Sequence, residues 1–500
     1  MVWYFCNRET RLASVNNRMH PPVHRLAAAV ILAIVLGFST SQAQPRNVVF
    51  ILSDDHRYDA MGFHENAPDF LRTPAMDKMA EEGVHIRNAF VTTSLCSPSR
   101  ASILTGRYAH NHGVVDNQRL IPEGTVFFPQ LLQDAGYETA FIGKWHMGEE
   151  SDAPRPGFDH WVSFRGQGVY VDPVLNVNGE RDTYRGHTTD ILTDFALDFL
   201  RERDGSEPFF LFLSHKAVHA EFEPAERHKG VYADVEVPYP ASMANTEANY
   251  RDKPRWVREQ RYGWHGVDYM YHGAMDFDEF YRRYAETLLG LDEGIGKVLA
   301  YLEESGLVEN TLVIYMGDNG FSFGEHGLID KRQAYESSIR VPMLAWAPGY
   351  IDPGSTIEEM VLNIDIAPTI LELAGVQAPD WVDGRSFLPL LTGGSVADWR
   401  EEFVYEYYWE HPFPHTPTVF ALRGDRYKYM FYHGVWDINE LYDLQLDPDE
   451  QHNLIDSPDH RERVEEMRTR LFQLLDADNA VDVKFRPPGG WQADERLLHD

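Results

Sequence analysis

Cysteine is almost absent from this sequence of 500 residues, which contains only Cys6 and Cys96. Cys6 lies ahead of an apolar, leader-like segment, so an exported chain would keep Cys96 alone and could form no internal disulfide. A single leftover cysteine in an exported protein requires an explanation, because the thiol is either a buried apolar group or a reactive one. The residues around Cys96 therefore decide how the chain is interpreted.

Basic residues are scarce relative to acidic ones. The chain has 45 Lys and Arg against 78 Asp and Glu, which gives a formal net charge of −33. Proteins that bind nucleic acid need a basic face to neutralise phosphates, so we exclude nucleic acid as a partner. An acidic body also repels anionic substrates at long range. Any anion-binding site in this chain therefore needs a local cluster of cations.

Long apolar segments are lacking outside the N-terminus. The run 26–38 follows a basic segment and precedes the small residues 41–43, which is the layout of a secretory signal peptide starting at Met1 or Met19. The run is too short to span a bilayer comfortably, so we favour a signal peptide at residues 1–43 over a membrane anchor. We expect a periplasmic or secreted protein with no membrane span after cleavage.

Cys96 stands where a helix is expected to begin. Pro98 precedes the apolar run Ala101–Leu104, and this pattern predicts a helix N-terminus at Cys96. Free backbone amides at that end of a helix favour negative charge, and Arg100 adds a permanent cation one turn further on. Such a position suits a nucleophile that attacks an anionic ester.

Polar side chains follow three short apolar segments that predict strands. The segments and the residues that follow them are 48–52 with Asp54 and Asp55, 139–142 with Lys144 and His146, and 312–316 with Asp318 and Asn319. Ligand sites in α/β sheets lie at the carboxyl ends of strands, so we expect these side chains to meet. Carboxylate and amide oxygens suit hard cations such as Ca²⁺ or Mg²⁺. The sequence therefore indicates a site for a divalent cation.

The predicted elements divide the chain after the leader into two parts. Further helices are expected at 73–82 (with Thr73 as its cap), 128–135, 189–203, 279–304, 364–374 and 464–475, and further strands at 209–213, 341–346, 403–408, 419–423, 427–432 and 441–444. The segment 221–277 shows no clear period, and such a long irregular insert is usually functional or mobile. We expect a catalytic domain at 45–400 and a C-terminal subdomain with a small antiparallel sheet and a helix at 401–500.

The run Cys96-Ser97-Pro98-Ser99-Arg100 resembles the signature of the type I sulfatases. The strings 136–146 and 317–332 are similar to further signatures of that family, and the similarity runs in order from about Asn47 to Leu454. The resemblance implies an α/β fold with a large mixed β-sheet sandwiched by helices, as in alkaline phosphatase, and a smaller C-terminal α+β subdomain.

The resemblance also implies the reactive groups. In the family, the Cys of the C-x-P-x-R signature is oxidised to Cα-formylglycine (3-oxoalanine) by a formylglycine-generating enzyme, and the hydrated aldehyde is the nucleophile. A single divalent metal is implied, Ca²⁺ in preference to Mg²⁺, and its ligands would be Asp54, Asp55, modified Cys96, Asp318 and Asn319. The implied catalytic residues are Cys96, Arg100, Lys144, His146, His219, Asp318 and Lys331.

The same resemblance implies the order of the catalytic steps. Three cations would hold the sulfuryl group, namely Arg100, Lys144 and Lys331. Asp318 is the expected base for the attacking hydroxyl, and His219, aided by Lys331, would protonate the leaving sugar oxygen. His146 would then take a proton from the second hydroxyl as sulfate leaves. His215, four residues before His219, is the alternative proton donor.

The lead hypothesis is an exported sulfatase that hydrolyses sulfate monoesters of carbohydrates derived from glycosaminoglycans or algal polysaccharides. The run Asp55-His56-Arg57-Tyr58, with residues 214–217 and the region of Tyr442, looks most like the N-acetylglucosamine-6-sulfatase group. The candidate substrate-binding residues are His215, Arg332 and His415. The aromatic segments 264–271 and 405–415 either line a sugar cleft or pack within the fold.

Two other functions stay open at this point. One is hydrolysis of phosphomonoesters or phosphonates on the same fold, although an oxygen-ligated single metal argues against a two-metal, His-rich phosphatase site. The other is a non-catalytic glycan-binding protein descended from the enzyme, although every expected catalytic residue type is present.

Overall fold

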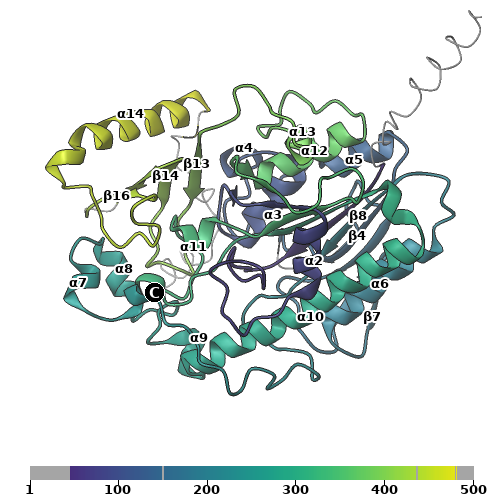
Figure 1. Cartoon of the computed structure of the whole chain (residues 1–500), viewed down its shortest axis with the longest axis horizontal. Coiled ribbons are helices and arrows are strands. Elements are labelled where there is room, and N and C mark those ends of the chain that lie inside the picture. Colours follow the sequence, from purple (N-terminus) through teal and green to yellow (C-terminus); the bar gives the residue numbers. More distant parts are fainter. Residues whose placement is uncertain (1–45, 149–150, 435–436, 479, 481–500) are drawn as a thin grey trace, which may run out of the picture. The chain divides into compact units, whose positions relative to one another are not determined.

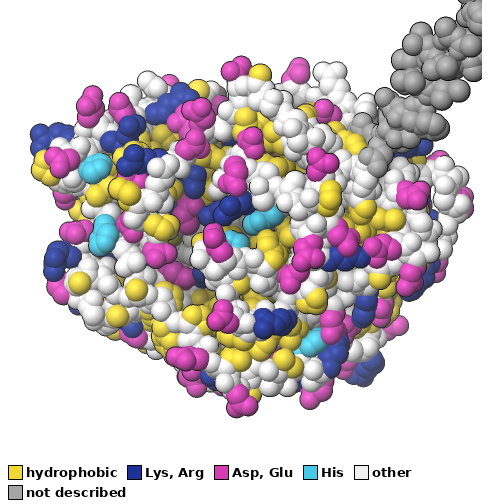
Figure 2. Space-filling view, viewed as in Figure 1, with side chains coloured by type: hydrophobic (Ala, Val, Ile, Leu, Met, Phe, Trp, Pro, Cys, Tyr) yellow, Lys and Arg dark blue, Asp and Glu magenta, His cyan; other side chains and the backbone are white. Residues whose placement is uncertain are grey.

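The computed structural model describes residues 46–148, 151–434, 437–478 and 480, which belong to one compact unit (Figure 1). The predicted signal peptide lies outside the described residues. Among the described residues, no helix combines the length and apolarity needed to cross a membrane. Acidic side chains are spread over the face shown in Figure 2, in keeping with the net charge of −33.

A ten-stranded mixed sheet forms the centre of the fold, in the order β11-β2-β10-β9-β1-β8-β4-β5-β6-β7. Its strands are β1 (Asn47–Ser53), β2 (Val84–Ile86), β4 (Glu138–Lys144), β5 (His160–Phe164), β6 (Val174–Val177), β7 (Glu180–Thr183), β8 (Phe209–Ser214), β9 (Thr311–Gly317), β10 (Met343–Trp346) and β11 (Ser355–Ile357). The middle strands β9, β1, β8, β4 and β5 run parallel, whereas β10 and β6 are antiparallel to their neighbours. The predicted large mixed sheet is thus confirmed.

Helices cover both faces of this sheet because its middle strands are apolar along their whole length. In β1, Val49 and Ile51 enter one core while Val48 and Phe50 enter the other, since successive side chains of a strand point to opposite faces. The first core includes residues of α2 (Pro74–Glu82), α6 (Thr188–Glu202) and α10 (Phe277–Glu304). The second includes residues of α3 (Cys96–Thr105), α5 (Phe128–Asp134), α12 (Ile366–Leu373) and α13 (Leu388–Leu391) (Figure 1).

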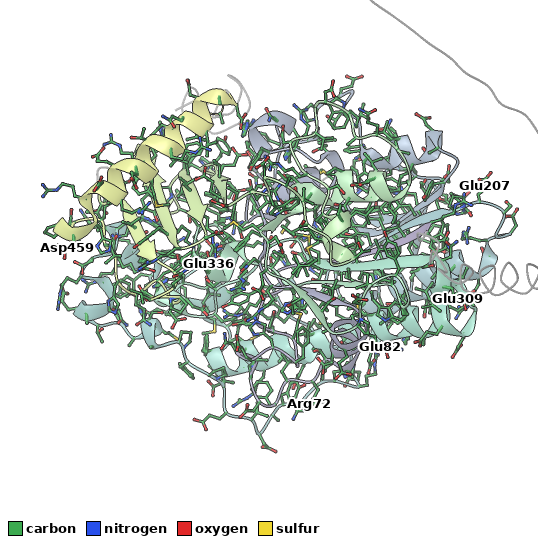
Figure 3. All side chains as sticks on the ribbon, turned by 45° about the horizontal axis from the view of Figure 1, so that its top comes forward. Arg72, Glu82, Glu207, Glu309, Glu336 and Asp459 are labelled. Atoms are coloured by element: carbon green, nitrogen blue, oxygen red, sulfur yellow. The ribbon has the colours of Figure 1, made fainter. Side chains whose placement is uncertain are left out.

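The carboxyl ends of the central parallel strands lie level with one another, along one side of the sheet. Leu52 of β1 pairs with Ser214 of β8 and with Met316 of β9, and Gly143 of β4 also pairs with Ser214. Glu207 and Glu309 precede β8 and β9, and Figure 3 shows both at the opposite edge, where these strands begin. The residues that follow β1, β4, β8 and β9 are therefore brought together by strand register alone.

A second, four-stranded antiparallel sheet lies in the C-terminal region, as predicted. Its strands are β13 (Glu402–Tyr407), β14 (Val419–Gly424), β15 (Tyr427–Tyr432) and β16 (Glu440–Asp443), and α14 (Arg461–Ala477) packs Leu471 and Leu475 against it. Glu336 of α11 (Glu336–Ile339) accepts a hydrogen bond from Lys428 at 2.9 Å and pairs with Arg423 at 3.2 Å. This buried ionic contact ties the small sheet to the rest of the molecule (Figure 3).

The segment 221–277 contains short helices that its sequence did not predict. They are η1 (Ala241–Met243), α7 (Glu247–Tyr250), α8 (Arg255–Gln260) and α9 (Met270–Gly273). The other short elements are β3 (Ala89–Phe90), β12 (Val361–Leu362), α4 (Ala109–His112), η2 (Leu307–Asn310), η3 (Glu325–Gly327), η4 (Asn363–Asp365) and η5 (Pro458–His460). The strands β5, β6 and β7 were also missed. All four residues of β7 are exposed, so its sequence carries no apolar alternation to indicate a strand.

Thr73 occupies the N-cap position of α2, as predicted, but its side chain does not cap the helix. The Thr73 hydroxyl accepts a hydrogen bond from the Gly62 amide and donates one to Asp77, and it makes no capping bond to the helix. The carboxylate of Asp292, on α10, instead accepts from the amides of Ala75 and Met76 at 2.9–3.1 Å. A side chain more than 200 residues away in the sequence therefore does what a local cap usually does.

Replacing Asp292 with Ala should lower the free energy of unfolding by about 1–2 kcal/mol, because two buried amides lose their acceptor. Asp292→Asn keeps an acceptor oxygen and is the matched control. Burial raises the pKa of the Asp292 carboxyl to about 7, against the opposing effect of its two backbone hydrogen bonds. The wild-type protein should therefore lose stability relative to Asp292→Asn as the pH rises from about 4 to 7. Urea unfolding at several pH values measures both effects, and equal stability of all three proteins would contradict the capping role.

Candidate active site

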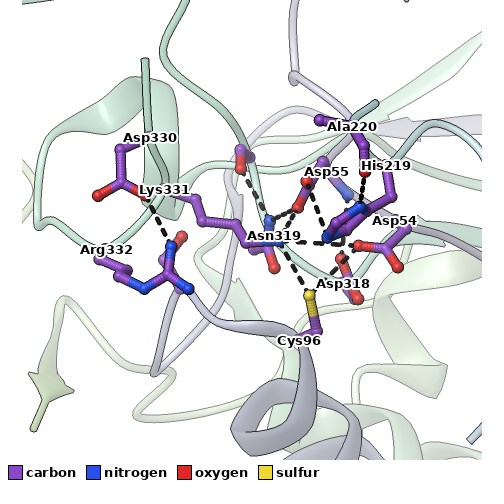
Figure 4. Close-up of polar contacts among 12 residues, drawn as sticks. Asp54, Asp55, Cys96, His219, Ala220, Asp318, Asn319, Asp330, Lys331 and Arg332 are labelled. Atoms are coloured by element: carbon purple, nitrogen blue, oxygen red, sulfur yellow. Dashed lines mark hydrogen bonds and ion pairs between the residues drawn. The ribbon is translucent and has the colours of Figure 1, made fainter. Parts of the chain in front are cut away.

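The carboxyl ends of β1, β4, β8 and β9 meet the first turn of α3 at one buried cluster. Asp54 follows β1, Lys144 ends β4 and Asp318 follows β9. Helix α3 begins at Cys96, as predicted, so the Sγ atom faces these side chains (Figure 4). Residues more than 270 positions apart in the sequence, such as Asp55 and Lys331, thus share one pocket.

Three carboxylates of this cluster are crowded together. Ligand oxygens of Asp54, Asp55 and Asp318 all lie within 4.8 Å of one another, and the three residues are at most 1% exposed. Burial raises the pKa of Asp55 to about 7, with Lys331 opposing this effect and the charges of Asp54 and Asp318 adding to it. Burial and the charge of Asp54 raise the pKa of Asp318 as well. Burial and mutual repulsion therefore oppose joint ionisation of the three groups, which requires compensating positive charge nearby.

Two oxygen atoms in the cluster lack hydrogen-bond partners among the described residues. They are Oδ2 of Asp55 and Oδ1 of Asn319, and both are buried. The Asn319 amide group is oriented by donating to Asp55 Oδ1 at 2.7 Å and to the Gly320 carbonyl at 2.9 Å. Unpaired buried oxygens beside crowded carboxylates fit a hard divalent cation, which these oxygen donors would hold.

Cations surround the carboxylates. Arg100 donates to Asp318 Oδ2 at 2.9 Å and to Asp54 Oδ2 at 3.3 Å, and it is held in place by Ser214 Oγ and the Lys144 carbonyl at 2.6 and 2.8 Å. Lys144 donates to Asp54, and Lys331 donates to Asp55. Although burial opposes ionisation, Lys144 and its neighbouring cations hold the pKa of Asp54 well below its usual range. The cluster is therefore the local concentration of positive charge that an anion site requires in an acidic protein.

The Cys96 thiol is buried between opposite charges. Its Sγ atom lies 3.3 Å from Asp54 Oδ1 and 2.9 Å from the Lys331 ammonium. Burial and the charge of Asp54 raise the pKa of the thiol to about 12, so the helix N-terminus does not make it a thiolate. An unmodified Cys96 is consequently a poor nucleophile at neutral pH.

The histidines occupy different surroundings. His219 lies 3.8 Å from Asp55 through its Nε2 atom, and its other ring nitrogen contacts the Ala220 carbonyl. His146 approaches the hydroxyl of Ser97, whose Oγ donates to the His146 carbonyl. His215 is fully buried, and the charged groups that act on its pKa are Asp190 and His187, which are not part of the cluster. The geometry therefore brings His219 to the cluster and places His146 against Ser97, the residue after Cys96, whereas His215 lies among other groups.

A cleft of about 1300 Å³ opens beside His219. Trp264 and Tyr271 from the irregular insert line it, and the Trp264 ring stacks on Phe413 with centroids 5.4 Å apart. Arg332 lies 3.5 Å over the Phe413 ring, so the two aromatic segments pack together behind Trp264. We call Trp264, Phe413 and Arg332 the aromatic wall, of which Trp264 lines the cleft. His415 is exposed near Gly263, the residue before Trp264, and it does not line the cleft.

Arg332 is already paired within the protein. It donates to Glu410 at 2.8 Å and to Asp330 at 2.9 Å, and it is 4% exposed. Sequence reasoning named Arg332 but missed its two carboxylate partners, and it also missed Ser214 and Gln167, which hold Arg100 and Lys144. Ser214 and Gln167 are uncharged, so only the fold could associate them with the site.

Comparison with known proteins agrees with this geometry. The family model described as Sulfatase matches residues 46–376, and that described as N-sulphoglucosamine sulphohydrolase, C-terminal, matches residues 324–477. N-acetylglucosamine-6-O-sulfatase of Bacteroides thetaiotaomicron is 33% identical over 91% of both chains. Human N-acetylglucosamine-6-sulfatase is 30% identical over 93% of this chain and 90% of the human protein.

Solved structures share the fold. One, of a protein in complex with its substrate D-glucosamine-2-N,6-O-disulfate, has a TM-score of 0.81 and 31% identity and covers 88% of this chain and 99% of that one. A phosphonate monoester hydrolase from Silicibacter pomeroyi has a TM-score of 0.72 and 23% identity over 89% and 98% of the two chains, which shows a common fold alone. The chain belongs to the type I sulfatases of the alkaline phosphatase superfamily, and its activity is that of a sulfuric ester hydrolase.

Proposed function

We propose that this chain is an exported sulfatase that removes sulfate from sulfated amino sugars, using a formylglycine at position 96 and one divalent cation. The observation that carries the proposal is the position of Cys96. It begins α3 and contacts Asp54 at 3.3 Å and Lys331 at 2.9 Å, beside the crowded carboxylates of Asp55 and Asp318.

The modification supplies what the thiol lacks. The pKa of Cys96 is raised to about 12 by burial and by Asp54, so very little thiolate is present at neutral pH. A hydrated aldehyde at position 96 would supply a hydroxyl to attack sulfur and an oxygen ligand in place of Sγ. Conversion of Cys96 therefore requires a formylglycine-generating enzyme in the host.

The cation site would be held by Asp54, Asp55, modified Cys96, Asp318 and Asn319, an oxygen-only set that favours Ca²⁺ with Mg²⁺ as the alternative. When bound, the cation would withdraw charge from a sulfate oxygen and lower the pKa of the attacking hydroxyl. The side chains of Arg100, Lys144 and Lys331 surround the same volume and would hold the remaining charge of the sulfuryl group.

Proton transfer is assigned to three residues. Asp318, whose pKa is raised by burial, would accept the proton of the attacking hydroxyl. Burial and the charges of Lys331 and Lys144 keep the pKa of His219 well below its usual value. A bound sulfate ester brings negative charge that opposes this effect, so His219 would carry its proton for the leaving sugar oxygen when substrate is present. His146 would take the proton that restores the aldehyde.

The sugar class is inferred from relatives and from the cleft wall. The similar proteins include N-acetylglucosamine-6-sulfatases, and one similar structure is described with D-glucosamine-2-N,6-O-disulfate. The Trp264 ring lines the cleft and is 41% exposed, so it offers a flat apolar surface on which a sugar ring could pack. It is supported from behind by Phe413, which contacts Arg332, and His415 lies near the neighbouring Gly263. We therefore propose 6-O-sulfated glucosamine derivatives as substrates. We further propose that the enzyme acts in the periplasm or outside the cell.

The peptide that contains Cys96 should carry an aldehyde in place of the thiol when the protein is produced in a host with the modifying enzyme. Intact-peptide mass spectrometry measures this change directly. Cys96→Ala should lower kcat by more than about 10³-fold and shift the melting temperature by only about 2–4 °C, because a small buried side chain is lost. Full activity with an unmodified thiol would contradict the proposal.

Chelation of divalent cations should abolish sulfate release, and Ca²⁺ should restore it. Because the cation relieves repulsion among three buried carboxylates, Ca²⁺ should also raise the melting temperature of the chelated protein. The variant Asp55→Asn should lose this thermal response, whereas the exposed control Asp182→Asn should keep it. A melting temperature that does not respond to Ca²⁺ would remove the metal assignment independently of activity.

The enzyme should prefer sulfate esters to phosphate esters. The purified, modified protein should hydrolyse p-nitrophenyl sulfate with a kcat/KM at least roughly tenfold above that for p-nitrophenyl phosphate, and it should release sulfate from N-acetylglucosamine 6-sulfate. Faster phosphate or phosphonate hydrolysis would favour the phosphonate-hydrolase alternative. Binding of the sulfated sugar without any release would indicate a non-catalytic glycan-binding protein.

A further inference from the structure

We propose that Lys216 forms a second anion-binding subsite beside the sulfuryl pocket, which takes a second sulfate or carboxylate group of the saccharide. This inference rests on the proposed function and extends it from one anionic group of the substrate to two.

Lys216 and His219 lie on one tight turn after β8. The His219 amide donates to the Lys216 carbonyl at 2.9 Å, and both side chains line the cleft of about 1300 Å³. Tyr170 joins them, since its hydroxyl donates to the His219 carbonyl at 2.7 Å and its ring lies 4.7 Å from the Lys216 ammonium. The ammonium is thus held by Tyr170 in the cleft that Lys216 shares with His219, the residue proposed to protonate the leaving sugar oxygen.

The Lys216 ammonium has no carboxylate partner. Within the described part of the chain, no ion pair within 4.0 Å and no side-chain hydrogen bond involves Lys216, although the residue is only 5% exposed. The ammonium is compensated by the face of Tyr170 and, beyond ion-pair distance, by the charges of Asp54 and Asp55. A buried cation without a direct carboxylate partner is costly to the fold, so an anionic ligand would complete this arrangement. Burial and the nearby Lys144 lower the pKa of Lys216 to about 8, which agrees with an incompletely compensated charge.

The other cations of the cleft are already neutralised. Arg282 pairs with Asp278 at 3.4 Å, Arg283 with Glu279 at 2.5 Å, and Lys229 with Glu226 at 2.8 Å. In the sulfuryl pocket, Arg100, Lys144 and Lys331 each contact an aspartate. Among the described lysines and arginines that line this cleft, Lys216 is therefore the one without a carboxylate partner.

The positive charge of Lys216 determines which ligand groups could bind it. A hydroxyl or an acetamido group would leave the ammonium without an anionic partner, whereas a sulfate or carboxylate oxygen would form a charge-assisted hydrogen bond. Two sources offer this group: an N-sulfate on the sugar that carries the scissile ester, or the carboxylate of an adjoining uronic acid. Both present an oxyanion within one sugar unit of the reacting sulfate.

The test compares kcat/KM for three substrates: N-acetylglucosamine 6-sulfate, glucosamine 2-N,6-O-disulfate, and a disaccharide in which a uronic acid adjoins N-acetylglucosamine 6-sulfate. Lys216→Met keeps the length of the side chain without its charge. In this variant, the preference for the doubly anionic substrate should fall by about 10- to 100-fold, mainly through KM. Lys216→Arg should restore most of that preference. The substrate whose advantage is lost identifies N-sulfate or carboxylate as the source.

The control is Lys229→Met, which removes a lysine paired with Glu226 at the rim of the same cleft and should not change the preference. Lys216→Met should also raise the melting temperature, because it removes an incompletely compensated buried charge. A preference that changes by less than twofold in every comparison, or equal losses of kcat on all substrates, would overturn the subsite. Sulfate release from N-acetylglucosamine 6-sulfate by the wild-type enzyme tests the proposed function separately, and its failure would overturn both.

Discussion

Repulsion among Asp54, Asp55 and Asp318 is the constraint on which the site depends. Three carboxylates that share a buried volume cannot ionise together without compensating charge. Arg100, Lys144 and Lys331 supply compensating charge through ion pairs with these carboxylates. Asp55 Oδ2 and Asn319 Oδ1 still lack hydrogen-bond partners among the described residues. The fold thus holds an arrangement that is costly by itself and that a divalent cation and an anionic ester would jointly relieve. Such stored unfavourable charge is typical of catalytic sites.

The parallel strands make this arrangement possible. A strand buried on both faces has a fixed register, because a shift by one residue would exchange its two sets of apolar side chains. The residues after β1, β4 and β9 are therefore positioned by the cores on both faces of the sheet rather than by their own contacts. Helix α3 adds Cys96 from the second core. Rigid elements that place charged groups at their ends explain how a crowded cluster is kept in one geometry.

Much of this was predictable from the sequence, for identifiable reasons. The polar residues after short apolar strands, such as Asp54 and Asp318, indicated the edge where the site lies, and Pro98 indicated where α3 begins. Features that depend on distant contacts could not be predicted. The capping of α2 by Asp292 and the pairing of Arg332 with Glu410 join residues far apart in the sequence. The raised pKa of Cys96 was also not foreseeable, since it reflects burial that outweighs the helix N-terminus.

The wall formed by Trp264, Phe413 and Arg332 has a consequence for how such an enzyme can diversify. Its aromatic rings come from the irregular insert and from the loop after β13, whereas the carboxylates and Cys96 come from the ends of the central strands. Under the proposed function, selection among sugars and transfer of the sulfuryl group would therefore rest on separate stretches of polypeptide. Substitutions in the two loops could redirect the enzyme toward another saccharide while the reaction centre stays as it is.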